Sequence, residues 1–241
     1  MSDLHAVLAI VLVSMLVQST FSFGGALVAL PLLALTVEVK TATVLMTLLA
    51  CSIAIVVVMG KWRDVEINDA WRLVVSACVG IPLGILFVGR VDGTILKTVL
   101  ALTVISFTIL SLVTPKSVRL AHSNYAFIFG LVAGFFGGAY NISGPPVVLY
   151  GSLVNWSSER FRATIQSFAL FTNIFAILGH YFAGNVTRQA LVYYAWSLPI
   201  VGASIWLGNV IHKAIPGERY AVVVKVLLLI LATRLLYSTV T

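Results

Sequence analysis

Polar and helix-breaking residues are concentrated in one apolar part of the chain, between Gly134 and Pro146. This segment lies within an apolar run over residues 125–154, and its polar side chains are Asn141 and Ser143. Inside a helix, glycine costs about 1 kcal/mol and proline about 3 kcal/mol relative to alanine. The prolines also donate no hydrogen bond to carbonyls one turn earlier. In hydrocarbon, such a break persists only where it is buried in protein or lines a polar cavity.

The segment therefore predicts a discontinuous membrane helix whose broken ends bind a small solute. A kink that only lets helices pack closely is the alternative. The charge pattern favours an anionic or neutral solute, because a cation carrier or carboxylate proton relay usually needs an acidic residue inside a span. All eight acidic residues fall in predicted loops or at their edges: Asp3, Glu38, Asp64, Glu66, Asp69, Asp92, Glu159 and Glu218.

A second interrupted stretch, residues 18–25, lies in the first apolar region and ends with Gly24 and Gly25. Helix N-termini offer unpaired amides and partial positive charge to an anion, and glycine lets the backbone approach it closely. We expect backbone amides around Gly24 and Gly25 and around residues 141–144 to coordinate the anion. The candidate substrate-binding residues are Gln18, Ser19, Thr20, Ser22, Gly24, Gly25, Asn141, Ser143, Gly144, Pro145, Gln166 and Asn173.

A polar stripe follows the broken segment, with Arg162, Gln166, Asn173 and His180 at intervals of 4, 7 and 7 residues on one helical face. Such a stripe faces protein or water rather than lipid. It is expected either beside the broken segment or in hydrogen bonds between helices. Arg162 and Lys40 are expected to attract anions at the membrane edge. The alternative for Arg162 is that its side chain only snorkels to the membrane surface. His180 is a candidate proton site, with a packed histidine as the alternative.

The elements that would position these residues follow from composition. The 241 residues are 60% hydrophobic and only 10% charged, with a mean hydropathy of +1.07, whereas a soluble domain carries about 25% charged residues. Apolar runs of about 20 residues predict helices rather than barrel strands. The net charge of +7 is scattered through short loops, which fits membrane topology rather than nucleic-acid binding. Cys51 and Cys78 lie in apolar spans, so neither a disulfide nor a metal site is expected.

The apolar runs predict a broken region over residues 4–35, then spans over 41–59, 70–89 and 94–113. The second broken region, residues 125–154, is followed by spans over 162–183, 189–210 and 219–238. The N-terminal residues lack a basic segment, so no cleaved signal peptide is expected.

The two halves of the chain resemble each other. Residues 21–26, 41–44 and 81–84 parallel residues 134–139, 162–165 and 198–202, in the same order. We therefore expect an all-α polytopic membrane protein with two homologous halves, residues 1–115 and 122–241. Inverted repeats are favoured, each with a Gly/Pro-broken, re-entrant helical region and three spanning helices. Parallel halves, in which each broken region crosses once, are the alternative. Interrupted helices in corresponding positions are typical of secondary transporters.

At residues 134–146, and at the counterpart Gly24 and Gly25, the chain resembles the TauE/SafE family, also called the sulfite exporter family. The likeness covers nearly the whole chain. It implies movement of sulfite, a sulfonate or a related small organic anion across the bacterial inner membrane. The first motif departs from the second, because Gly24 and Gly25 are followed by a single proline, Pro31.

The hypothesis from the sequence is a secondary transporter, an exporter, in which one half rocks against the other to alternate access. It needs no cofactor and no metal, and its partners would be the anion, the lipid bilayer and a coupling ion, H⁺ or Na⁺, with a homodimer as one arrangement. A small-anion channel is the first alternative. An intramembrane serine hydrolase using Ser143 and His180 is the second, but it lacks an acid to orient the histidine.

Overall fold

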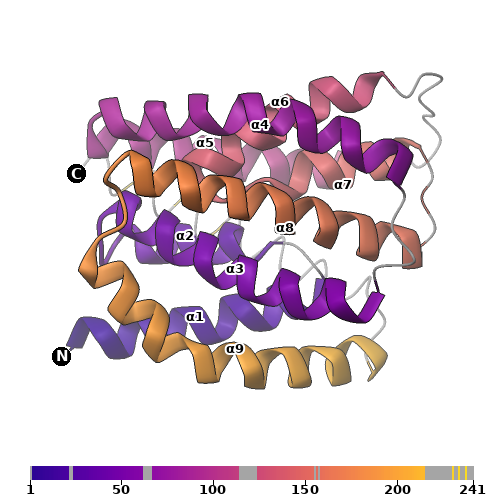
Figure 1. Cartoon of the computed structure of the whole chain (residues 1–241). Coiled ribbons are helices and arrows are strands. Elements are labelled where there is room, and N and C mark those ends of the chain that lie inside the picture. Colours follow the sequence, from indigo (N-terminus) through magenta and orange to yellow (C-terminus); the bar gives the residue numbers. More distant parts are fainter. Residues whose placement is uncertain are drawn as a thin grey trace.

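The computed structural model describes residues 2–21, 24–61, 67–113, 124–154, 156, 158–214, 230, 233 and 237. Over these residues the chain forms nine helices and no strand (Figure 1). Their bounds are α1 Ser2–Phe21, α2 Gly25–Leu33, α3 Val39–Lys61, α4 Ile67–Arg90, α5 Gly93–Val113, α6 Tyr125–Tyr140, α7 Gly144–Leu153, α8 Ser158–Phe182 and α9 Arg188–Ala214.

Five helices in the described part are long and apolar enough to cross a membrane. They contain Val39–Met59, Ala70–Arg90, Gly93–Leu110, Ala163–Phe182 and Arg188–Gly208. These segments agree with the predicted spans to within a few residues, and none of the five contains Asp or Glu. The prediction of an all-α polytopic membrane protein is therefore confirmed. The predicted last span, residues 219–238, lies outside the described residues except at 230, 233 and 237.

Both regions predicted to be broken are broken. The first divides into α1 and α2, and Gly24 precedes α2 with φ +92°. The second divides into α6 and α7 at Asn141, which has φ +54°. The Asn141 amide donates to the carbonyl of Gly137 at 2.8 Å, which is the usual closure of a helix that ends in a left-handed residue.

The prolines act differently from the prediction. Pro145 and Pro146 lie in the first turn of α7, where a backbone N–H would have no intrahelical acceptor. The fixed φ of proline suits this position, so the two prolines favour the start of α7. They leave no helical carbonyl unpaired. The break itself is made by Asn141 in its left-handed conformation.

The two helices that follow the breaks are short. At 1.5 Å per residue, α2 with 9 residues is about 14 Å long and α7 with 10 residues is about 15 Å long. A hydrocarbon core is about 30 Å thick, so neither helix can cross it alone. Each packs against its predecessor, α2 on α1 and α7 on α6.

A ridge of glycines brings α4 and α6 into backbone contact. A Cβ on Gly84 of α4 would lie 2.7 Å from the backbone nitrogen of Ala139, and a Cβ on Gly134 of α6 would lie 2.6 Å from the Cα of Ala77. Gly80, Gly130 and Gly138 are equally close to the opposite backbone. These glycines form a packing ridge of small residues, which allows the two helices to approach to backbone distance.

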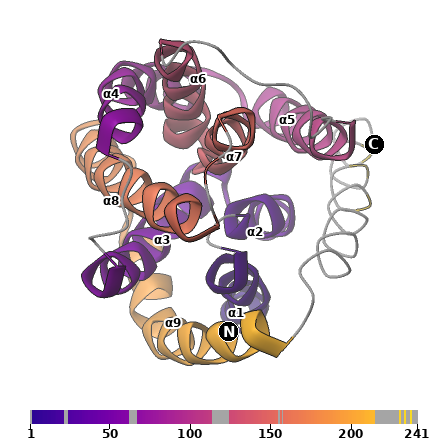
Figure 2. The same ribbon diagram turned by 90° about the vertical axis from the view of Figure 1, so that its right-hand side faces the viewer.

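The closest helix packing joins elements from different halves of the sequence. Helix α4 packs on α6 and α8, whereas α1 and α3 pack on α9; Figure 2 shows α4 beside α6 and α1 beside α9. Ser19 of α1 donates to the carbonyl of Ser204 of α9 at 2.7 Å, and Ser52 of α3 bonds Tyr194 of α9 at 2.8 Å. Helix α4, from the first half of the sequence, thus packs among helices of the second half, and α9, from the second half, packs among helices of the first.

Candidate substrate-binding site

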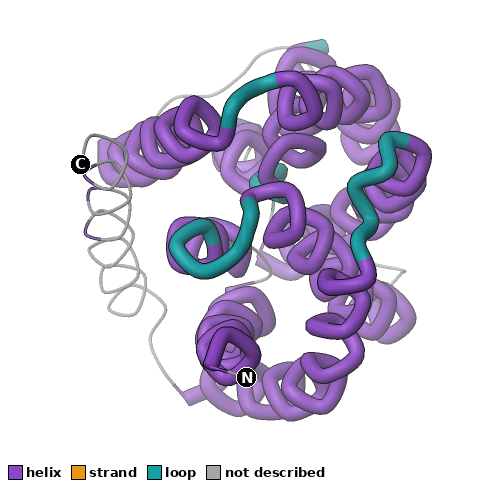
Figure 3. The backbone as a smooth tube through the Cα atoms, turned by 90° about the vertical axis from the view of Figure 1, so that its left-hand side faces the viewer, coloured by secondary structure: helices purple, strands orange, loops and turns teal. Residues whose placement is uncertain are grey.

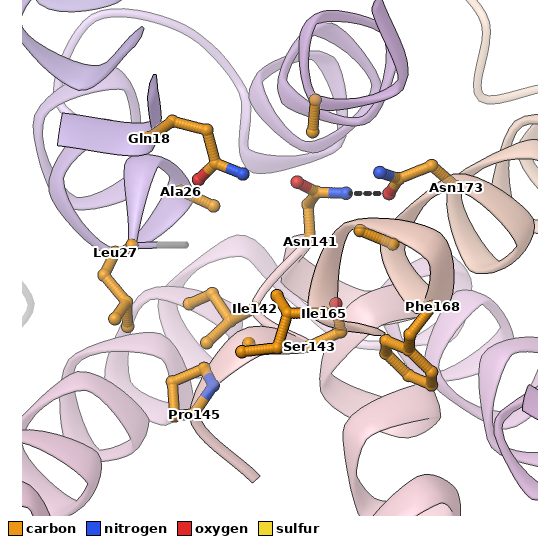
Figure 4. Close-up of a pocket in the computed structure, with 14 residues that line it drawn as sticks. Gln18, Ala26, Leu27, Asn141, Ile142, Ser143, Pro145, Ile165, Phe168 and Asn173 are labelled. Atoms are coloured by element: carbon orange, nitrogen blue, oxygen red, sulfur yellow. Dashed lines mark hydrogen bonds between the residues drawn. The ribbon is translucent and has the colours of Figure 1, made fainter. Parts of the chain in front are cut away.

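A small cavity lies where the two broken regions meet (Figure 4). Helices α1, α2 and α3 supply one side, and the α6–α7 connection and α8 supply the other. The space open to the centre of a water molecule is about 30 Å³, which is room for two or three waters. Its walls are formed by Gln18, Gly24, Ala26, Leu27, Ala50, Asn141, Ile142, Ser143, Gly144, Pro145, Ile165, Phe168, Ala169 and Asn173.

Seven of the twelve predicted substrate-binding residues line this cavity: Gln18, Gly24, Asn141, Ser143, Gly144, Pro145 and Asn173. Residues 18 and 141 are far apart in sequence, so the tertiary fold brings the two predicted half-sites together. Their role as substrate ligands stays a prediction.

Four other predicted residues are not among those lining the cavity. The hydroxyl of Thr20 donates to the carbonyl of Leu16 in its own helix, and that of Ser19 is shared between the carbonyls of Met15 and Ser204. Gly25 lies in the first turn of α2, and Gln166 is buried in α8. Ser22, the last of the twelve, lies outside the described residues.

Lys40 and His180 are not among the residues that line the cavity. Lys40 is in the first turn of α3, and Arg162 belongs to α8, with its side chain outside the described part of the chain. His180 is fully buried near the end of α8, where its Nδ1 pairs with the amide nitrogen of Asn185 at 3.1 Å. Since His180 does not line the cavity with Ser143, the pairing that a serine hydrolase would use is not formed here.

The orientation of the Asn141 amide follows from a chain of hydrogen bonds that begins at a backbone carbonyl. Thr47 Oγ1 donates to the carbonyl of Thr43 at 2.8 Å, so it can only accept from Asn141 Nδ2, 3.2 Å away. Asn141 Nδ2 also donates to Asn173 Oδ1 at 2.8 Å. Because carbonyls only accept, this chain leaves Asn173 Nδ2 as a donor and Asn141 Oδ1 as an acceptor.

Gln18 is fixed in the same way. The backbone N–H of Gly25 donates to Gln18 Oε1 at 2.9 Å, so the Nε2 group of Gln18 is left to point elsewhere. Figure 4 shows the nitrogen of Gln18 and the oxygen of Asn141 turned toward one another across the cavity. The site thus presents two amide NH₂ groups and one amide oxygen, each held in a defined orientation.

The expectation of unpaired backbone amides is wrong at three positions. The Gly25 amide is capped by Gln18, and those of Asn141 and Ile142 donate to carbonyls of α6. Pro145 adds no amide. What remains is the N-terminal partial charge of α2 and α7, whose first turns both reach the cavity. Side-chain amides therefore take the place of these three predicted backbone donors.

Sequence reasoning missed Thr47 and the apolar walls of the cavity. Thr43 and Thr47 are four residues apart on α3, and this spacing, which puts both hydroxyls on one face, was an available signal. The apolar wall residues, such as Ile165 and Phe168, carry no such signal because their types do not differ from those of lipid-facing positions.

Comparison with curated proteins and with solved structures gives no match. The family model described as "Sulfite exporter TauE/SafE" matches residues 6–235, which is nearly the whole chain. This agrees with the apolar spans and the broken helices described above. The chain therefore belongs to the sulfite exporter TauE/SafE family of multi-pass membrane transporters.

Proposed function

We propose that this protein is a secondary transporter that exports sulfite, a sulfonate or a related small organic anion across the bacterial inner membrane. The observation that carries the proposal is the cavity at the meeting of the two broken regions. Two helix N-termini and two oriented amide NH₂ groups face it. Among the described residues that line it, none is Asp or Glu. A cavity that offers hydrogen-bond donors and no acidic side chain suits an anion.

We further propose that the halves are inverted repeats and that α1–α2 and α6–α7 are re-entrant hairpins. The lengths of α2 and α7, about 14 and 15 Å, support a hairpin in each half. The α2–α3 and α8–α9 connections both lie at the left-hand end of the bundle in Figure 1, which is the end that faces the viewer in Figure 3. Helices α3 and α8, which correspond in the sequence repeat, therefore run in opposite directions, as an inverted repeat requires.

The bodies that move in alternating access would then differ from the sequence halves. Helices α1, α2, α3 and α9 pack as one group, and α4, α6, α7 and α8 pack as the other, with α3 on α8 between them. Each group supplies one wall of the cavity. Rocking of residues 1–115 against 122–241 would tear α4 from α6, whereas rocking of the two packed groups about α3 and α8 keeps that backbone contact.

The test is flux of radiolabelled sulfite in liposomes that contain the purified protein. A carrier gives saturable flux, and an opposing gradient of sulfite or of its coupling ion stops it. Flux that rises linearly with concentration indicates a channel instead. If folded protein moves neither sulfite nor any small sulfonate above the rate of empty liposomes, the proposed function is wrong.

A further inference from the structure

We propose that the cavity binds its anion as a monoanion that carries a hydrogen, which for sulfite means hydrogensulfite rather than the sulfite dianion. The inference rests on the proposed function and refines the substrate of the same site. It depends on three features of the cavity, namely its charge, its single oriented acceptor and its size.

The charge of the cavity does not suit a dianion. Among the described residues that line it, none is Lys, Arg or His. The side-chain donors that line it are neutral: the hydroxyl of Ser143 and the amides of Gln18 and Asn173, which are 8% and 4% exposed. The cost of moving an ion out of water grows with the square of its charge, so a dianion costs about four times as much as a monoanion. Helix N-termini provide only about half a unit charge each.

The hydrogen-bonding pattern asks for a donor on the ligand. Gln18 Nε2 and Asn173 Nδ2 can each donate to an oxygen of the anion. The oxygen of Asn141, in contrast, can only accept, because both hydrogens of its amide are directed to Thr47 and Asn173. A fully deprotonated oxyanion would face this oxygen with repulsion. Hydrogensulfite, written HO–SO₂⁻, has two oxygens for the donors and one O–H for Asn141.

The size of the cavity points the same way. Room for two or three waters, about 30 Å³, fits a small anion with a central atom and three oxygens. Transport of hydrogensulfite also carries one proton with each substrate. The chain then needs no titrating side chain in the cavity, in agreement with the place of His180 away from its walls.

The proposal is tested by binding to the purified protein in detergent, under argon, over a series of pH values. Three probes separate charge from shape: sulfite, which titrates near neutral pH; chlorate, a pyramidal monoanion without a hydrogen; and sulfate, a dianion throughout. The sulfite affinity should fall about tenfold per pH unit once hydrogensulfite becomes the minor species. Chlorate should bind more weakly with no pH dependence, and sulfate should not compete.

Matched variants test the donors. Gln18→Glu keeps the oxygen that accepts from Gly25, and Asn173→Asp keeps the oxygen that accepts from Asn141, while each replaces the NH₂ group with a negative oxygen. Both should fold and should lose at least tenfold in affinity for sulfite and chlorate. His180→Gln should keep the pH profile of sulfite binding. A flattened profile in this variant would instead assign the titration to the protein.

The outcomes separate this inference from the function on which it rests. Sulfite affinity that is constant or rises with pH, or equal competition by sulfate, overturns the monoanion proposal and leaves anion transport standing. Normal binding by Gln18→Glu and Asn173→Asp overturns the assigned donors. If neither sulfite nor chlorate binds the folded protein at any pH, the proposed function itself fails.

Discussion

The backbone contact between α4 and α6 makes a sharp prediction for a single methyl group. In Gly84→Ala, the new Cβ would clash with the carbonyl oxygen of Phe135 and would lie 2.7 Å from the backbone nitrogen of Ala139. Ordinary contacts of a Cβ begin at 3.4 Å, so the helices must separate by at least about 0.7 Å. Both neighbours are backbone atoms, and no side-chain rotation relieves the contact.

The expected cost follows from two opposing effects. Overpacking of a well-packed interior costs about 1–3 kcal/mol, and the upper end applies because backbone cannot give way. Alanine in place of glycine returns up to about 1 kcal/mol of helix propensity. The net loss is therefore about 1–2 kcal/mol. At about 2–4 °C per kcal/mol for a chain of this size, the unfolding temperature of the variant in detergent should fall by several degrees.

Gly89→Ala is the matched control, because Gly89 lies on the same helix, is exposed, and would place its Cβ in open space. Its unfolding temperature should equal or exceed that of the unaltered protein. The reasoning fails if Gly84→Ala is as stable as Gly89→Ala, since α4 and α6 would then not be in backbone contact.

Three further predictions concern the break and the second interface. Asn141→Gly should fold, because glycine suits φ +54°, but it should lose transport because the side-chain amide is gone. Asn141→Leu should lose transport and should also be less stable by about 1–2 kcal/mol. Transport by the glycine variant would refute the role of the side chain. Thr47→Val removes the acceptor of Asn141, so KM for sulfite should rise roughly fivefold, equivalent to about 1 kcal/mol, while Thr98→Val on the exposed face of α5 leaves KM unchanged. Gly208→Ala should push α1 from α9 and lower the unfolding temperature, whereas Gly202→Ala, with open space around its Cβ, should not; equal stability of the two would contradict the packing of α1 on α9.

The broken helices were predictable from local chemistry, but the cause of the break was not. A cluster of glycines and prolines in an apolar run indicates an interruption wherever it occurs. Which residue turns the chain depends on backbone angles, and here Asn141 does so while Pro145 and Pro146 begin the next helix. The packing ridge on α6 was likewise visible as glycines at intervals of four.

The donors at the candidate site were predicted only in part. Gln18, Asn141 and Asn173 were identified as polar residues inside apolar segments, because such residues in a membrane span face protein or water. The sequence could not show that Gln18 caps the Gly25 amide, or that Thr47 orients Asn141. These are contacts between elements, and composition contains no information about their partners.

Helical class, membrane crossing and the two interrupted regions are thus properties of the sequence alone, because they depend on hydropathy and on the local cost of glycine and proline. Tertiary structure decided which helices pack together, since α4 packs on α6 and α1 on α9 through contacts between distant residues. It also decided the polarity of the cavity. A side-chain amide has a donor end and an acceptor end, and only the groups packed around it determine which end faces the solute.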